Sequence, residues 1–171
     1  GETVDMKHEL NFGRRAAAAL LILAVMAMGI LAAGEGVYAA ESGTAYLATA
    51  TPYYKHPVTG KIEDAGQNEG IGQGMTESVL YKKALVEITD SGKTYATVRF
   101  YMMDNISKVK FWAQNRGASG WSSTSYQIMQ ENIGGKYCSD FRINIPSKTA
   151  IVKAQMYVSA MGRNVIFYMN F

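Results

Sequence analysis

The sequence predicts an all-β protein, an antiparallel β-sandwich of about eight strands over residues 40–171, preceded by an N-terminal signal helix at residues 6–39. Two observations favour the sandwich: apolar and polar residues alternate with a period of two, and clusters of turn-forming residues separate the alternating runs. A third observation, an apolar run near the beginning of the chain, predicts the signal helix. With 171 residues, 48% of them apolar, the chain can bury one core but not two large ones, so we expect one domain.

The first segment has the three parts of a secretion signal. Basic residues, including Arg14-Arg15, precede an unbroken apolar run at residues 16–33, and Val37-Tyr38-Ala39 resembles a cleavage signal. We therefore expect an exported mature chain that begins at Ala40. An uncleaved anchor is the alternative, because the apolar run approaches the ~20 residues that a membrane span needs. We expect membrane contact only through this signal or through an anchor downstream of the sequence.

The alternating runs follow residue 40 and are separated by short turn sequences. Asp90-Ser91-Gly92-Lys93, Arg116-Gly117-Ala118, Ile133-Gly134-Gly135 and Met161-Gly162-Arg163 each divide two runs, and the last joins two apolar strands in a tight hairpin. The expected strands are residues 44–49, 78–89, 94–103, 108–114, 122–130, 140–145, 150–159 and 164–171.

One long stretch, residues 53–76, departs from the alternation. It contains five glycines, a proline, several charges and few apolar residues, and therefore predicts a long loop. Loops of this length in compact domains are usually functional or disordered. The stretch ends in Gly72-Gln73-Gly74-Met75, which places a large soft side chain between small residues.

Composition excludes several classes of function. The net charge of +3 is mild and the basic residues are scattered, so we expect no nucleic-acid partner. The single cysteine, Cys138, permits no internal disulfide, and we expect it to be a buried strand residue. His56 is the one histidine after residue 40, which leaves too few groups for a histidine metal cluster, and we expect it to pack a loop. We expect Glu63-Asp64 to form a solvated turn and the protein not to be an enzyme.

Methionine is prominent among the soft donors. Most of the seven methionines after residue 40 lie in alternating runs, where packing explains them. Met75 and Met161 instead lie in the glycine-rich stretch and in a hairpin turn. A thioether is a neutral, soft donor suited to haem iron or Cu(I), although a turn methionine is commonly a hydrophobic lid.

Three motifs resemble those of a known family. Residues 54–66, YKHPVTGKIEDAG, followed by Gly72-Gln73-Gly74-Met75, resemble a loop of the Shp haem-binding family of Gram-positive surface proteins, which is distantly related in fold to NEAT domains. Residues 161–168, MGRNVIFY, resemble the terminal hairpin of that family, and Phe111-Trp112 fits a third, shorter stretch. The similarity spans nearly all of the chain after residue 40, in the same order.

The resemblance implies an immunoglobulin-like sandwich that holds one haem b (iron protoporphyrin IX) between the long loop and the hairpin, with Met75 and Met161 as axial iron ligands. It also implies a relay protein, secreted or at the cell surface of a Gram-positive bacterium. Such a protein accepts haem from an upstream surface receptor and passes it to the lipoprotein of an import transporter. Two departures from the family pattern are a loop shortened around residues 67–71 and the lack of a continuation toward an anchor.

Further contacts are expected around the two ligands. Gly74 adjoins Met75, we expect Tyr157, Val165 and Phe167 to form an apolar wall, and a cation such as Arg163 or Lys153 to approach a propionate. The alternative function is a secreted carbohydrate-binding or adhesive module in which Trp112 and Trp121 form a stacking platform.

Overall fold

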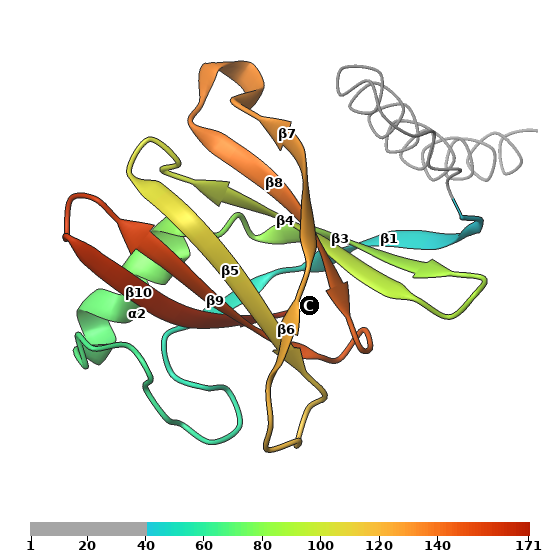
Figure 1. Cartoon of the computed structure of the whole chain (residues 1–171), viewed down its shortest axis with the longest axis horizontal. Coiled ribbons are helices and arrows are strands. Elements are labelled where there is room, and N and C mark those ends of the chain that lie inside the picture. The colour runs from blue at the N-terminus through green and yellow to red at the C-terminus, as the bar shows by residue number, and fades with distance from the viewer. Residues whose placement is uncertain (1–40) are drawn as a thin grey trace, which may run out of the picture.

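The computed structural model describes residues 41–171, which form two packed antiparallel sheets (Figure 1). The signal segment expected at residues 6–39 lies outside the described residues. Sheet A has the strand order β1 (Gly43–Thr49), β3 (Lys83–Thr89), β4 (Thr94–Tyr101), β8 (Cys138–Ile145) and β7 (Tyr126–Glu131). Sheet B has the order β2 (Thr51–Tyr53), β10 (Arg163–Asn170), β9 (Ile151–Val158), β5 (Ile106–Gln114) and β6 (Ser122–Thr124).

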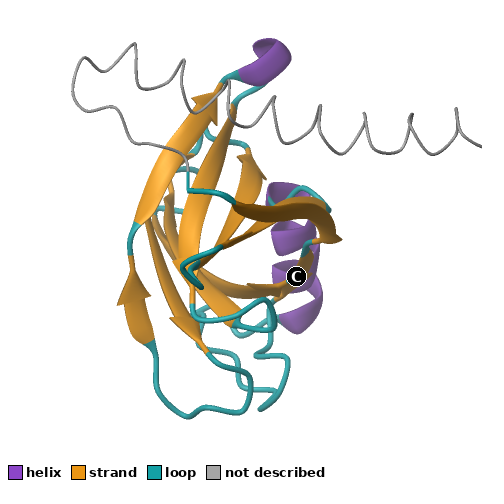
Figure 2. Cartoon of the chain, turned by 90° about the vertical axis from the view of Figure 1, so that its right-hand side faces the viewer, coloured by secondary structure: helices purple, strands orange, loops and turns teal. Residues whose placement is uncertain are grey.

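The predicted antiparallel β-sandwich is confirmed, with ten strands in place of about eight. One added strand arises because the expected strand at residues 122–130 divides at Ser125 and passes from one sheet to the other. Thr124 pairs with Phe111 in sheet B, whereas Tyr126 pairs with Ile143 in sheet A. Figure 2 shows the two layers of strands, with a helix beside them and the short 3-10 helix η1 (Ile133–Gly135) at one end.

Aromatic side chains from both sheets fill the space between the layers. The ring of Phe100 on β4 lies 5.3 Å from that of Phe141, 5.8 Å from that of Phe111 and 5.6 Å from that of Phe167, measured between ring centroids. All four are at most 1% exposed, and full burial of such a side chain contributes about 1.5–3 kcal/mol. Cys138 is 1% exposed on β8, which confirms it as a buried strand residue.

Helix α2 (Glu69–Val79) replaces part of the expected loop and the beginning of the expected strand at residues 78–89, so both predictions were wrong there. Three glycines inside the helix oppose it by roughly 1 kcal/mol each relative to alanine. A local capping bond and a tertiary contact offset this cost. The Asn68 side chain caps the helix by accepting the Ile71 N–H at 3.1 Å, and Gln73 donates to the Pro52 carbonyl at 3.0 Å. Of the helices in residues 41–171, none has the length and apolar character to span a membrane.

Candidate functional site

Helix α2 lies at the end of the sandwich where the β9–β10 turn is found (Figure 1), and one of its faces is exposed to solvent at Ile71 and Gly74. Ile71, Gly74 and Met75 share that face because residues three and four apart are neighbours on a helix. Ile71 is 72% exposed, and a Cβ added to Gly74 would meet no atom within 4 Å. Met75 is half-buried and packs against the core. The helix therefore supplies one thioether beside a flat, open position.

The β9–β10 turn carries Met161 at its tip. The N–H groups of Met161 and Gly162 both donate to the Val158 carbonyl, at 3.1 and 2.9 Å, which closes the turn tightly. Gly162 has a φ of +64°, a conformation that favours glycine. Met161 is 41% exposed, so the second thioether is accessible from solvent.

A buried carboxylate holds these two elements together. Asp64, whose side chain is 0% exposed, accepts the Tyr54 hydroxyl at 2.5 Å and the two terminal Arg163 nitrogens at 3.0 and 3.2 Å. It also accepts the backbone N–H groups of Ile166 at 2.9 Å and Gly66 at 3.0 Å. We call this group of Tyr54, Asp64 and Arg163 the Asp64 clasp. The earlier expectation of a solvated turn at Glu63-Asp64 was wrong for Asp64.

The charges of the clasp follow from its contacts. Burial alone would raise the pKa of Asp64, but the hydrogen bonds from Arg163, Tyr54 and two backbone N–H groups outweigh it and lower the pKa below its ordinary value. Burial and the bond to Asp64 raise the pKa of Tyr54 to about 12. The clasp therefore consists of an ionised Asp64 carboxylate that accepts hydrogen bonds from the neutral Tyr54 hydroxyl and from the Arg163 guanidinium.

Tyr54 also connects the clasp to helix α2. Its backbone N–H donates to the Gln73 side-chain oxygen at 2.8 Å. A Cβ added to Gly72 would overlap the Tyr54 ring, so the helix backbone packs directly on that ring. The structure therefore links α2, one residue before Gly74-Met75, to the first residues of β10, two residues after Met161.

The expected apolar wall lies only partly where it was placed. Tyr157 is half-buried on the outer face of β9, and the Lys108 Nζ lies 5.4 Å from its ring centroid. Val165 and Phe167 are instead 0% exposed in the sandwich core, which corrects the expectation that they line the site. Strand alternation directs the half-buried Ile166, which lies between them, to the outer face.

The two cations expected near a propionate already have carboxylate partners. Arg163 is held by Asp64, as described above. Lys153 pairs with Glu63 at 3.0 Å, and both side chains are less than a quarter exposed. Neither cation is a free surface charge in this structure.

The tryptophans expected as a stacking platform make contacts within the protein. The Lys153 Nζ lies 5.2 Å from the Trp112 ring centroid and 4.6 Å from that of Trp121. Trp121 also stacks on Tyr168 with ring centroids 5.8 Å apart. Both tryptophans are half-buried, and each already has a cation over its ring.

His56 is a loop-packing residue, as expected. It is 8% exposed, its Nε2 lies 2.7 Å from the Gln114 side-chain oxygen, and its Nδ1 accepts the N–H groups of Val58 and Thr59 at 3.1 Å. Both ring nitrogens are therefore used. Within residues 41–171 no group of three or more His, Cys, Asp or Glu side chains is arranged to hold a metal ion.

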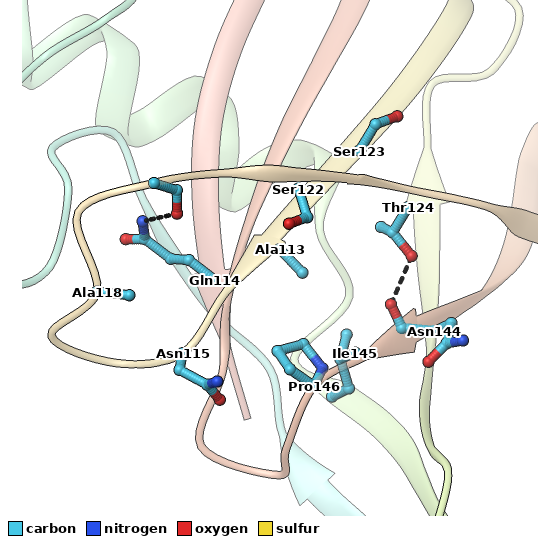
Figure 3. Close-up of a pocket in the computed structure, with 11 residues that line it drawn as sticks. Ala113, Gln114, Asn115, Ala118, Ser122, Ser123, Thr124, Asn144, Ile145 and Pro146 are labelled. Carbon is cyan, nitrogen blue, oxygen red and sulfur yellow. Dashed lines mark hydrogen bonds between the residues drawn. The ribbon is translucent and has the colours of Figure 1, made fainter.

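A separate cavity of about 380 Å³ lies where β5 and β6 meet the β8–β9 turn (Figure 3). Its hydrogen-bonding groups are neutral: Gln114 donates to the Gly120 carbonyl at 2.9 Å, and Thr124 donates to the Asn144 carbonyl at 2.6 Å. The lining residues are Ala113, Gln114, Asn115, Ala118, Gly120, Ser122, Ser123, Thr124, Asn144, Ile145 and Pro146. This cavity offers neither a soft donor nor a charge.

Sequence reasoning missed Asp64, Tyr54 and Ile166. Strict alternation along residues 164–171 could have indicated Ile166, but five consecutive apolar residues there obscure which face each one occupies. Asp64 gave no local signal, because its Arg163 and Ile166 partners lie 99 and 102 residues away.

The fold and these side chains define a class of protein: a β-sandwich with two methionine side chains that reach the surface at one end. The family model described as "Cell surface heme-binding protein Shp" matches residues 42–171. The chain therefore belongs to the Shp family of cell-surface haem-binding proteins, and haem is its ligand, as the sequence resemblance implied.

No curated protein matches this chain. Among solved structures, the chain is similar to the NEAT5 domain of IsdX2, a B. anthracis hemophore in complex with heme. The two are 12% identical with a TM-score of 0.48, and the match covers 76% of this chain and 96% of that one.

Proposed function

We propose that this protein is a haem carrier that binds one haem b between α2 and the β9–β10 hairpin, with Met75 and Met161 as the two axial iron ligands. The observation that carries the proposal is that two methionine side chains reach the surface on two separate elements at the same end of the sandwich (Figure 1), and that the Asp64 clasp connects these elements. Family membership supports haem as the ligand. Thioether donors also fit haem iron, because they bind without losing a proton.

The neighbouring side chains suit a flat, apolar ligand. Ile71 and Gly74 flank Met75 on α2, and Tyr157 and Ile166 are two of the outward-facing side chains of the hairpin. Lys108, close to Tyr157, is an exposed cation that a propionate could approach. Arg163 and Lys153 are two further candidates for binding a propionate. Each would then interact with the propionate and with its present carboxylate partner at the same time.

A carrier role follows from the donor set. With a methionine on each side, iron has no open coordination position, which disfavours oxygen activation and enzyme chemistry. Neutral ligands also bind ferric iron less strongly than anionic ones. We therefore propose a relay that accepts haem from an upstream surface receptor and delivers it to a transporter lipoprotein.

Absorption spectroscopy of the purified protein mixed with haemin, with and without dithionite, tests this proposal. We expect a six-coordinate, low-spin ferrous spectrum that is lost in Met75→Ala and in Met161→Ala. Met103→Ala is the matched control for Met75, since both pack against the core, and Met102→Ala matches Met161, since they are 43% and 41% exposed. Both controls should keep the spectrum. A spectrum of free haemin alone, or one unchanged in both ligand variants, would overturn the proposal.

A further inference from the structure

The Asp64 clasp occupies a particular place relative to the two proposed ligands. Its hydrogen-bond donors include Arg163 and Ile166 on β10, together with Tyr54, which packs on α2. On one side, Tyr54 donates to Asp64 and its ring lies against the backbone of α2 at Gly72. On the other side, Arg163 and the Ile166 N–H bind the same carboxylate from β10. One buried group is therefore shared by the helix and the hairpin.

We propose that Asp64 is a positioning residue that fixes the separation of Met75 and Met161 and thereby keeps both thioethers within reach of one haem iron. The inference rests on the proposed bis-methionine site. Asp64 acts on the two methionines indirectly, through Tyr54 and Arg163. A metal ion binds tightly only when both donor atoms are held at the correct distance. Residues that contact the ligands, and not the metal itself, commonly hold the ligands in place.

The packing of the sandwich separates this role from general stabilisation. The apolar core consists of strand residues such as Phe100, Phe141 and Val98, together with residues at the end of α2, and the clasp lies outside it. Sheet register is likewise set by backbone pairing within β9 and β10. Backbone pairing joins β2 to β10 at Tyr168–Asn170 and not at the beginning of β10. Loss of the clasp should therefore leave the sandwich folded while the beginning of β10 and the β9–β10 turn shift relative to α2.

The chain offers a matched control in a second bidentate pair. Arg99 donates to Asp140 at 2.7 and 3.0 Å, and the Asp140 side chain is 9% exposed. These two residues face each other on β4 and β8, strands that are already joined by backbone hydrogen bonds. Asp140→Asn therefore removes a comparable ion pair without freeing one element from another.

The spectroscopic test compares Asp64→Asn with Asp140→Asn after loading with haemin. We expect Asp64→Asn to show a high-spin, five-coordinate fraction and to lose haem to excess apomyoglobin about tenfold faster, a change equal to one lost charged hydrogen bond. Asp140→Asn should match the wild type in both measurements. Tyr54→Phe is the substitute variant if Asp64→Asn fails to fold. It keeps the ring on Gly72 but removes the hydroxyl, so we expect an effect on haem binding between those of the wild type and Asp64→Asn.

A distance measurement on the haem-free protein separates failure of this inference from failure of the proposed function. Nitroxide labels at Ser78→Cys on α2 and Ala160→Cys in the β9–β10 turn, in a Cys138→Ala background, report the separation by pulsed electron resonance. We expect a narrow distribution that broadens in Asp64→Asn and not in Asp140→Asn. A distribution that stays narrow in Asp64→Asn overturns the inference. So does a broadened distribution combined with an unchanged haem spectrum. Absence of haem binding by the wild type would instead overturn the proposed function.

Discussion

The two ends of the sandwich differ in how their polar groups are held. At the cavity end, the Gln114–Gly120 and Thr124–Asn144 hydrogen bonds join residues 6 and 20 positions apart, and all the lining groups are neutral. At the helix–hairpin end, Asp64 binds Arg163 across 99 positions of sequence, with no exposure of its side chain. A hollow is present at the first end, and charge and soft donors at the second. This difference is the reason for proposing the haem site at the helix–hairpin end, because haem iron needs donor atoms and the cavity end offers only open volume.

The largest effect expected from this difference comes from Gly72→Ala. A Cβ there would overlap the buried Tyr54 ring, and overpacking of this kind costs about 1–3 kcal/mol. We expect the urea midpoint to fall accordingly and haem affinity to drop, because α2 must move away from Tyr54.

Gly120→Ala at the cavity end is the control for that variant. No atom lies within 4 Å of a Cβ at Gly120, so the free energy of unfolding should stay within about 0.5 kcal/mol of the wild-type value. Equal losses in the two variants would show that the ends do not differ in packing.

The second prediction concerns the pH dependence of stability. The folded-state pKa of Asp64 lies below its ordinary value, so its contribution is fully present above the unfolded pKa of about 3.9 and is lost as pH falls through the folded value. Urea midpoints measured from pH 7 downward should therefore fall more steeply in the wild type than in Asp64→Asn. Glu63, whose pKa is also lowered, is present in both proteins and cancels from the comparison. Parallel curves would show that Asp64 gains no net stabilisation from its donors.

The third prediction separates folding from ligand binding at Gly74. Alanine there meets no neighbour and should stabilise the haem-free protein by about 0.5–1 kcal/mol, the usual difference from glycine inside a helix. The same methyl group would lie beside Met75, where the ligand is proposed to approach. We therefore expect a higher melting temperature without haem together with weaker haem binding by titration. A gain in both would place the ligand away from this face of α2.

The sandwich could be predicted because alternation is a local property of each strand. Helix α2 was missed because three glycines suppress helix propensity, although two signals were present: Asn68 at a capping position, and the apolar residues Ile71, Met75 and Val79 at helical spacing. Tertiary contacts through Gln73 and Gly72 supply what propensity lacks. Local composition alone does not contain those contacts.

The candidate site was predictable to a different extent for each residue. Met75 and Met161 stood out because they lie outside the alternating runs, and both are accessible in the structure. Val165 and Phe167 were assigned to the wrong face because a continuous apolar run does not reveal the direction of its side chains. Asp64 was taken for a solvated turn because its partners are close only in the folded chain.

The smallest effect is expected at the cavity end, from Ser122→Trp. Ser122 is exposed on the short edge strand β6 and lines the cavity, so an indole there can occupy the open volume without displacing core residues. A surface substitution of this kind usually changes stability by no more than about 0.5 kcal/mol. The haem spectrum and affinity should match those of the wild type, as measured by titration with haemin. A tenfold loss of affinity in a variant that melts normally would move the haem site to this cavity, because a filled cavity cannot affect a ligand that binds at the helix–hairpin end.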